Sequence, residues 1–487
     1  MNPSPRMSAL SVKRQSLPAL LLSVFALAGC AVGPDYVPPS VQMSSTFKGA
    51  AAVNERAGAP TPELAQWWTG FNDPVLDRVV ATALAQNLTL AQATARVAQA
   101  RATTRAARAA LLPAGQMNVQ VAAAHQSLED PLGRVENSQP GFDRNSRLYQ
   151  ASAGASWEID VFGGLRRSAE AAQADYEAAQ ASSVAARLSV IAETADTYVL
   201  VRTVQARLAL AREQTATQNR RVDLAQLRYS RGVAPELELR QAQGELATTA
   251  ANVPVLEAAL VSARNGLDIL MGIEPGTVDE ALDSPRPIPQ APAIQTAEGP
   301  PSLLRRRPDV IVAERHLAAS NARIGQALSE YYPKISLSAL VGSATTVAGN
   351  VFTGDAALMQ GVAGLRWRLF DFGTVDAEVQ AARGKNAEAL AAYRLSILQA
   401  TADVEDAFSL VVKREAQEQQ LALGETALQR ARASALAAYQ SGSENYSQVL
   451  DADDRLQRVQ DARIVAQSDA ARAAVASFLA LGGGWDE

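Results

Sequence analysis

The sequence is poor in the residues that catalysis, metal binding and covalent cross-linking use most. Its 487 residues include one cysteine and two histidines. A single cysteine cannot form a disulfide within the chain, so stability has to come from packing and assembly. His125 and His316 stand far apart, and no Gly-rich phosphate loop or paired metal-ligand spacing accompanies them. We therefore expect a protein that is not an enzyme and that holds no cofactor and no metal ion.

Large aromatic side chains are also scarce, and negative charge exceeds positive charge. Aromatic residues make up 5% of the chain, whereas alanine is the commonest residue. This composition favours long Ala-rich helices with small contacts over a thick core of large side chains. The net charge is -5, and it becomes -8 once the three positive residues of segment 1–29 are removed. We do not expect such a chain to bind nucleic acid.

The N-terminal residues are typical of an export signal. Positive charges precede an apolar run, residues 17–29, that is too short to cross a bilayer as a helix. The run ends in Leu27-Ala28-Gly29-Cys30, which resembles the bacterial lipobox. We expect cleavage before Cys30 and acylation of that cysteine, the alternative being a buried thiol behind an ordinary signal. Ala31 replaces the Asp that is usual for inner-membrane retention, which favours the outer membrane.

A duplicated unit is the most informative feature of the sequence. Residues of the same type recur at a constant offset of 210 over about 75 residues. A constant offset that keeps aromatic residues and glycines in register indicates one structural unit, present twice, whose length is fixed. The matching pairs are Trp157 and Trp367, Phe162-Gly163 and Phe372-Gly373, Tyr198 and Phe408, Tyr229 and Tyr439, and Gly232 and Gly442.

Each unit is expected to contain a helix, two strands, a very long helix, a tight turn and a returning helix. Between Gly163 and Gly232, and again between Gly373 and Gly442, about 68 residues include no proline and little glycine. An uninterrupted helix of that length is roughly 100 Å long. Because so long a helix needs partners along its whole length, the sequence predicts coiled-coil-like packing.

Four segments alternate between apolar and polar side chains, as half-buried strands do: residues 116–121, 149–159, 335–339 and 363–369. A soluble half-buried sheet has the same pattern, so alternation alone leaves both environments open. In a membrane, four strands cannot close a barrel, and several chains would have to share one. The polar stretches 129–146 and 342–357 would then be outer loops.

A proline-rich stretch separates the two units. Eight prolines between residues 271 and 308 predict a connector without long regular structure. The expected segments are the signal peptide 1–29, a lipid tether and equatorial segment 30–75, the first repeat 76–270, the connector 271–307, the second repeat 308–482 and a tail 483–487.

Three stretches resemble the TolC-like outer-membrane efflux proteins, and within them the lipoprotein branch that includes OprM and the NodT-type factors. They are residues 30–36, 67–76 and 304–314, and the Arg-Arg-Arg-Pro-Asp run of the third is the most specific. The resemblance implies a mainly α-helical homotrimer with a twelve-stranded membrane β-barrel, four strands per chain, on a long coiled-coil tunnel. It further implies an outer-membrane duct that a periplasmic adaptor connects to an inner-membrane RND-type transporter.

The resemblance also assigns roles to the turns between the long helices. Each turn contains a glycine that lets the chain reverse, which is a sufficient structural reason for the residue. In the family these turns are the periplasmic tips that meet the adaptor. The expected adaptor-contacting residues are Gly232, Val233, Ala234, Gly442 and Ser443.

A gate is expected beside the second tip. Asp451 matches the family's acidic residue at the narrowest part of the tunnel, where three symmetry copies would repel each other and attract cations. A solvated Asp in the first turn of a helix is the ordinary alternative. Other gate positions depart from the family, because they hold Gln448, Glu444 and Glu238. We therefore expect apolar packing or Tyr439, rather than ion pairs, to hold the gate shut.

Two other functions remain open on the residues. One is a duct for type I secretion, and the other is a coiled-coil structural lipoprotein that does not conduct. The four alternating segments argue against the second, and the Arg-Arg-Arg-Pro-Asp run favours drug or metal efflux over the first. The transported compound is not encoded in any motif, because substrate choice in such pumps lies mostly with the inner-membrane transporter.

Overall fold

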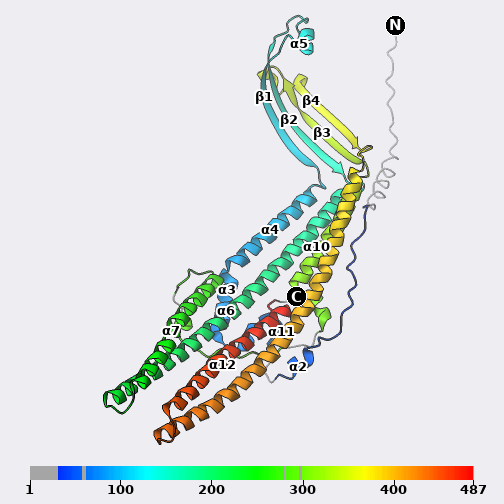
Figure 1. The fold of residues 1–487 in the computed structure, drawn as a ribbon. Helices are drawn as coiled ribbons and strands as arrows, with labels where there is room; N and C mark the ends of the chain where they lie inside the picture. Colours follow the sequence, from blue (N-terminus) through cyan, green and yellow to red (C-terminus); the bar gives the residue numbers. More distant parts are fainter. Residues whose placement is uncertain (1–30, 57–61, 278–279, 295–298, 486–487) are drawn as a thin grey trace, which may run out of the picture. The chain divides into compact units, whose positions relative to one another are not determined.

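The structure is a computed structural model that describes residues 31–56, 62–277, 280–294 and 299–485. The expected export signal and Cys30 lie outside the described residues. Helices dominate the described chain, and its β-strands form one sheet (Figure 1).

Both copies of the repeat fold in the same order, each with a helix, two strands, a helix of 67 residues and a returning helix. The first copy consists of α4 Leu88–Ala109, β1 Ala114–His125, β2 Asn145–Ile159, α6 Gly164–Ser230 and α7 Glu236–Met271. The second consists of α10 Pro308–Ser329, β3 Lys334–Thr345, β4 Ala357–Arg366, α11 Thr374–Gln440 and α12 Tyr446–Ala480. The predicted fold class, mainly α-helical with four strands per chain, is confirmed.

The offset between the two copies changes once, between the paired strands. It is 220 from the start of α4 to the start of α10 and from β1 to β3, but 210 from α6 to α11 and from α7 to α12. From the sequence alone only the second offset is evident. Because α4 and α10 have equal lengths, as do α6 and α11, most of the difference lies in the loops that connect the paired strands, residues 126–144 and 346–356.

Those loops differ from the prediction. The first contains a short helix, α5 Pro131–Glu136, which begins at a proline and is capped by the Asp130 carboxylate. The second is shorter than the expected 342–357, because β3 continues to Thr345. Two short 3-10 turns, η3 Ala348–Asn350 and η4 Gly354–Ala356, fill it.

Short elements surround the two repeats. Before the first repeat lie α2 Ala50–Asn54, η1 Leu64–Phe71 and α3 Pro74–Gln86, and between the repeats lie α8 Glu280–Asp283, η2 Pro300–Ser302 and α9 Leu303–Arg306. The described part of the proline-rich connector therefore contains no long element.

The chain divides into two compact units that cut across both repeats. Unit 1 comprises the residues up to Pro38, 99–176 and 315–390, and unit 2 comprises 39–98, 177–314 and 391–487. Each repeat thus contributes its strands and the adjoining helix ends to unit 1, and the remainder of its helices to unit 2.

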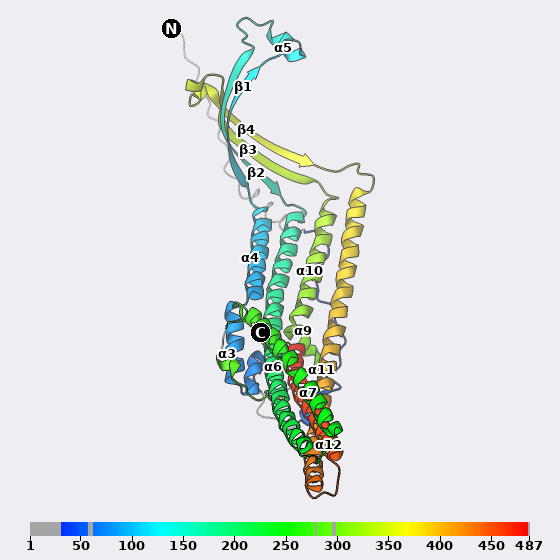
Figure 2. The same cartoon turned by 60° about the vertical axis from the view of Figure 1, so that its left-hand side comes forward.

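Unit 1 is built around the four-stranded antiparallel sheet, whose strand order is β1-β2-β3-β4. Next to the sheet the ends of α4, α6, α10 and α11 lie side by side in that order (Figure 2). Thr104 of α4 donates to the Ala172 carbonyl of α6 over 2.8 Å, and Asn386 of α11 donates to Ser320 of α10 over 3.0 Å. Asp175 of α6 pairs with Arg323 of α10.

Aromatic side chains join the strands to the helices at the base of the sheet. The indole N–H of Trp157 donates to the Leu111 carbonyl, and that of Trp367 donates to the Tyr331 carbonyl, both over 2.9 Å. These equivalent bonds show that Leu111 and Tyr331 occupy the same place in the two copies. Just beyond, the ring of Phe162 stacks on that of Tyr332 at 4.6 Å.

The N-terminal segment is attached to the same region of unit 1. The Val32 N–H donates to the Phe162 carbonyl over 3.0 Å. Arg167 of α6, whose side chain is buried, binds the Val32 and Gly33 carbonyls and pairs with Asp35 at 2.7 Å. The chain therefore begins its described course beside the junction between β2 and α6.

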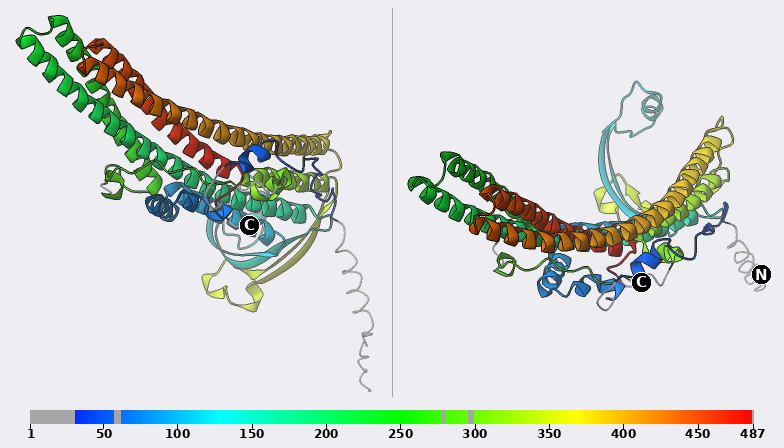
Figure 3. Two further views of the ribbon diagram at one scale, coloured as in Figure 1. Left: turned by 90° about the horizontal axis from the view of Figure 1, so that it is seen from below. Right: turned by 60° about the horizontal axis from the view of Figure 1, so that its bottom comes forward.

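Unit 2 contains two helical hairpins, α6 with α7 and α11 with α12 (Figure 3). Ion pairs show that α12 lies between α11 and α6. Arg463 of α12 reaches Glu425 of α11 at 2.8 Å. On the other side, Asp461 of α12 pairs with Arg207 of α6 at 2.7 Å, and Arg472 of α12 pairs with Asp196 of α6 at 2.6 Å.

Trp67 and Phe478, two of the largest fully buried side chains, lie where η1 contacts the returning helix α12. Trp67 is only 1% exposed and stacks on Phe478 at 5.2 Å, so the tryptophan has a packing role. Asp73 caps α3 through the Val75 N–H and also accepts a hydrogen bond of 2.5 Å from the Tyr198 hydroxyl. Burial and this carboxylate raise the pKa of Tyr198 well above its usual range.

Helix α7 has an unusually apolar surface. Among the described helices it is the one whose length and composition would allow it to cross a membrane. Yet Val255, Val261 and Ile269 are exposed rather than packed within the chain. These exposed apolar side chains are surface on which another chain can pack.

Candidate functional site

The two hairpin turns are built alike. In each, a glycine in the left-handed region ends the long helix, Gly232 at φ 66° and Gly442 at φ 75°. The following residue then donates its N–H back into the helix, Val233 to the Arg228 carbonyl and Ser443 to the Ala438 carbonyl. No atom lies within 4 Å of a Cβ built on either glycine. Backbone conformation, rather than lack of space, therefore requires glycine at both turns.

The turns expose different chemistry. Val233 and Leu237 of the first hairpin are apolar and largely exposed, while Ala234 is buried. Gly442 and Ser443 of the second hairpin are exposed and polar or small. Of the two turns, the first therefore presents the apolar surface that a protein partner can cover.

Farther along the helices from the turns, a buried ion pair joins the two hairpins. Arg221 of α6 pairs with Asp453 of α12, and their side chains are 11% and 7% exposed. Arg432 of α11 reaches the same carboxylate at 2.8 Å. A buried carboxylate shared by two guanidinium groups keeps its charge compensated, and it ties α6, α11 and α12 together.

A second contact between the hairpins lies closer to the turns. Arg228 of α6 pairs with Glu238 of α7 at 2.7 Å and also donates to the hydroxyl of Tyr439 on α11. The ring of Tyr439 lies 5.1 Å from that of Tyr446. We call these residues the tip cluster: Arg221, Arg228, Glu238, Tyr439, Tyr446 and Asp453.

Burial shapes the electrostatics of the tip cluster. Burial lowers the pKa of Arg221, with an opposing contribution from Tyr446 and a reinforcing one from Arg432. Burial likewise raises the pKa of Tyr446. The Tyr446 hydroxyl has no hydrogen-bond partner among the described residues. The cluster is thus a desolvated polar contact in which the charges are paired, while the Tyr446 hydroxyl and Asp453 Oδ2 make no hydrogen bond among the described residues.

The residues predicted for a gate fall into two groups. Glu238 and Tyr439 belong to the tip cluster, whereas Glu444, Gln448 and Asp451 are exposed. The Asp451 side chain is 53% exposed and pairs with Arg455 one turn further along α12, at 3.0 Å. Asp451 and Asp453, two residues apart, therefore point to different sides of the helix.

What holds the gate shut stays a prediction, but within the chain ion pairs do connect the two hairpins. The buried pair of Arg221 and Asp453 joins the two hairpins, and Glu238 is neutralised by Arg228 instead of repelling Glu444. Tyr439 contacts the other hairpin through Arg228. One sequence signal could have identified Asp453: with Val449 and Leu456 it recurs at i, i+4 and i+7, and all three are buried.

Comparison with known proteins agrees with this architecture. The profile of the family described as "Outer membrane efflux protein" matches residues 79–273 and 299–483. The starts of the two matched segments differ by 220 and their ends by 210, which are the two offsets of the structural repeat. The chain belongs to the outer membrane efflux protein family.

Individual relatives of this efflux protein cover nearly its whole length. It is 31% identical over 92% of both chains to the pyoverdine export outer membrane protein OpmQ of Pseudomonas putida. It is 30% identical over 96% of both chains to the toluene efflux pump outer membrane protein TtgF of the same species. Among solved structures, the outer-membrane channel OprN shares 31% identity with a TM-score of 0.81, over 94% of this chain and 100% of that chain.

Family membership places the two units of the efflux protein. Its relatives are trimeric channels with a β-barrel in the outer membrane and a helical tunnel in the periplasm, the outer-membrane parts of tripartite pumps with an adaptor and an RND transporter. The sheet of unit 1 is therefore the membrane part, and the hairpins of unit 2 belong to the periplasmic tunnel. The predicted family, function, partners and outer-membrane location are confirmed.

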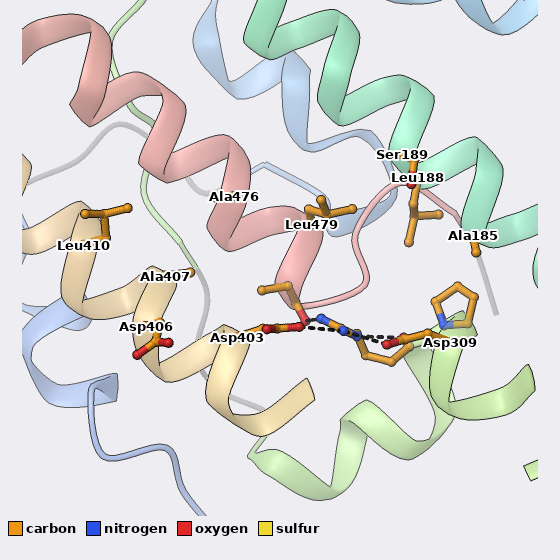
Figure 4. A pocket seen from close by; sticks show the side chains of 13 residues that line it. Ala185, Leu188, Ser189, Asp309, Asp403, Asp406, Ala407, Leu410, Ala476 and Leu479 are labelled. Carbon is orange, nitrogen blue, oxygen red and sulfur yellow. Dashed lines mark hydrogen bonds and ion pairs between the residues drawn. The ribbon is translucent and has the colours of Figure 1, made fainter. Parts of the chain in front are cut away.

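The Arg-Arg-Arg-Pro-Asp run of the efflux protein has a structural role. Arg307 is the last residue before α10, and its side chain is mostly buried. Its two acidic partners, Asp309 and Asp403, are labelled in Figure 4. Its guanidinium pairs with Asp309 at 2.7 Å and Asp403 at 2.9 Å, and donates to the Ala480 carbonyl. These bonds outweigh burial and raise the pKa of Arg307. The run thus fixes α10 to α11 and to the end of α12, beside a cavity of about 600 Å³.

Proposed function

We propose that the tip cluster locks the periplasmic end of this efflux duct. The observation that carries the proposal is the buried ion pair between Arg221 and Asp453, because it joins the α6–α7 hairpin to the α11–α12 hairpin. The duct has to widen at this end for cargo to pass, and widening requires the hairpins to separate. Separation exposes both charges to water and breaks the contact in a single step.

The contact nearer the turns adds a second layer to the lock. Arg228 binds the Glu238 carboxylate of its own hairpin and the Tyr439 hydroxyl of the other hairpin, so it connects the two. A guanidinium offers several donors in a fixed plane and suits such a bridge. In this proposal Glu238 orients Arg228, and Tyr439 is the group released when the hairpins part.

Asp451 has a different task in this proposal. Its exposed carboxylate faces away from the contact between hairpins, together with exposed Gln448 and Glu444. Three symmetry copies around a narrow opening attract cations and repel anions. The pair with Arg455 reduces this field without removing it, because both side chains are more than half exposed to water.

The turns themselves are the proposed docking points for the adaptor. Val233 supplies exposed apolar surface at the first tip, and Gly442 and Ser443 supply a small polar turn at the second. An adaptor that binds both tips can move the two hairpins in different directions. Adaptor binding then supplies the free energy that breaks the tip cluster.

Lipidation of Cys30 completes the anchoring of the duct. The neighbouring residue, Ala31, lies against Gly163, where a Cβ would come within 2.6 Å of the Ala31 Cα. This glycine follows the end of β2, at the base of the membrane sheet. The position supports acyl chains that enter the membrane next to the barrel.

Cargo selection is not part of the proposed role of this chain, and neither is catalysis. Two relatives of nearly equal identity are named for different cargoes, pyoverdine and toluene. A duct that passes chemically different compounds is best explained by selection elsewhere in the pump. We infer export of small toxic compounds that the transporter supplies.

Single-channel recording tests the lock directly. The mature trimer, extracted in detergent and inserted into planar bilayers, should show a small, cation-selective conductance. Asp453→Ala should increase the conductance or the open fraction, and Asp451→Asn should lower cation preference with little change in opening. A wild-type channel that is already fully open would refute a lock at the tips.

A further inference from the structure

Both outer edges of the sheet lack a partner among the described residues. β1 pairs only with β2, and β4 pairs only with β3. Unpaired backbone groups of an edge strand are a template for another strand, and within a bilayer they have to be paired. Apolar side chains on both edges, including Val119 and Leu365, are exposed. A second copy of the chain can pair both edges at once when the copies follow one another in a ring.

The two copies of the repeat indicate how the edges meet. In the first hairpin Ala114 lies opposite Ser156, and in the second Lys334 lies opposite Arg366. β3 therefore corresponds to β1 with an offset of 220, and β4 corresponds to β2 with an offset of 210. The β2–β3 ladder, in which Ala153 lies opposite Val341, is the junction between the two copies within the chain.

We propose that β4 joins β1 of the partner subunit in the register of the β2–β3 ladder. Shifted by the two offsets, the pair of Ala153 and Val341 becomes Ala363 opposite Val121 of the partner subunit. Trimer formation is a property of the family, whereas this register specifies which residues of this chain meet. It depends neither on the lock nor on the cargo.

Side-chain chemistry agrees with the register. Trp367 lies opposite Met117 of the partner subunit, and Leu365 lies opposite Val119 of the partner subunit, so apolar residues face apolar residues. Between them, Arg366 lies opposite Asn118 of the partner subunit on the polar face. A slip by one residue would place Leu365 opposite that asparagine and expose every apolar side chain to the wrong face.

An aromatic contact should complete the junction. Within the chain Phe162, just after β2, stacks on Tyr332, just before β3. Their counterparts are Phe372, just after β4, and Leu112 of the partner subunit. Phe372 is fully exposed and has a φ of 53°, which is unusual for a large side chain. The exposed ring of Phe372 is apolar surface that Leu112 of the partner subunit would cover in this register.

Disulfide trapping distinguishes the register from its neighbours. Residues directly opposite each other have Cβ atoms close enough for a disulfide, whereas positions two residues away do not. Val121→Cys with Ala363→Cys should give cross-linked trimers on oxidation. Val119→Cys or Ala123→Cys with Ala363→Cys should not. The pair Ala153→Cys with Val341→Cys, which is opposite within the chain, is the positive control, and single-cysteine variants control for Cys30.

Two outcomes of the cross-linking experiment would contradict the proposal. Preferential cross-linking of the 119 or 123 pair would overturn the register. If the positive control forms its disulfide in intact trimers and none of the three test pairs links the chains, the proposed strand pairing is wrong.

The aromatic contact has a matched control in the chain. Phe352 in the outer loop is 100% exposed and Phe372 is 102% exposed. Phe372→Ala should lower the association constant of each interface about tenfold, seen as trimer dissociation in detergent at a lower temperature. Phe352→Ala should leave dissociation unchanged, and Leu112→Tyr should raise the dissociation temperature by restoring an aromatic pair. Equal behaviour of the two alanine variants would overturn the contact.

Discussion

Removal of the Asp453 carboxylate should unlock the duct. Asp453→Ala leaves Arg221 buried without its counter-charge, because both side chains are nine-tenths buried or nearly so. Loss of one partner of a buried ion pair typically costs about 3–5 kcal/mol. Because the charge is exposed to water once the hairpins separate, most of this cost falls on the closed state.

The magnitude predicts a large change in gating. Each 1.4 kcal/mol changes an equilibrium constant tenfold. A cost of about 3 kcal/mol therefore shifts the closed-to-open equilibrium by roughly a hundredfold for each protomer. We expect planar-bilayer recordings of Asp453→Ala to show a much larger open fraction. Arg221→Ala with Asp453→Ala should open less than Asp453→Ala alone, because the guanidinium then left without the Asp453 carboxylate is that of Arg432, which is 38% exposed.

The neighbouring residue is the control for this experiment. Asp454 pairs with Arg458 on the same helix, and the two side chains are 51% and 76% exposed. Such a pair contributes only about 0.3–0.5 kcal/mol, so Asp454→Ala should gate as wild type does. If Asp453→Ala assembles normally and its conductance matches that of Asp454→Ala, the buried pair has no part in holding the tips.

Four further outcomes are expected. Tyr446→Phe should stabilise the detergent-extracted trimer by about 1 kcal/mol, whereas Tyr439→Phe, which loses the Arg228 hydrogen bond, should destabilise it. Because burial raises the pKa of Tyr446, wild type should lose stability as the pH rises from about 10 through that raised pKa, and Tyr446→Phe should lose less in thermal unfolding from pH 8 to 11. Trp67→Ala should cost about 3–5 kcal/mol, measured as a lower Tm, and an unchanged Tm would contradict its place in the core. Val233→Asp should abolish efflux from cells while trimers still form, whereas Leu132→Asp in the outer helix α5 should not; normal efflux in both would remove Val233 from the adaptor contact.

Helix lengths and strand pairing could be predicted because they leave regular patterns in the sequence. Gly232 and Gly442 mark the ends of the long helices, and alternation marks the strands. The offset of 220 is not evident in the sequence, because the helices before the strands, α4 and α10, keep their lengths but share few side chains. The short helix α5 is not evident for another reason, since six residues are too few to show a period.

The tip cluster could be predicted only in part. The sequence identifies Tyr439 and Glu238 because they lie beside the turns, where the family has its gate. It does not identify Arg221 and Asp453, because their burial depends on packing between two hairpins far apart in the sequence. A charged residue on a helix is usually solvated, and only its position on the apolar stripe indicates otherwise.

The equal length of α6 and α11, 67 residues each, restricts how this protein can change size in evolution. An insertion of seven residues in α6 alone would move its tip about 10 Å past its neighbour and separate Arg221 from Asp453. The same insertion would have to occur in both long helices and both returning helices, in multiples that keep the packing stripe in phase. The depth of periplasm that the duct crosses is therefore encoded four times in one gene, so adaptation to a deeper periplasm requires coordinated change at all four places. The outer loops, where the two copies already differ, carry no such restriction.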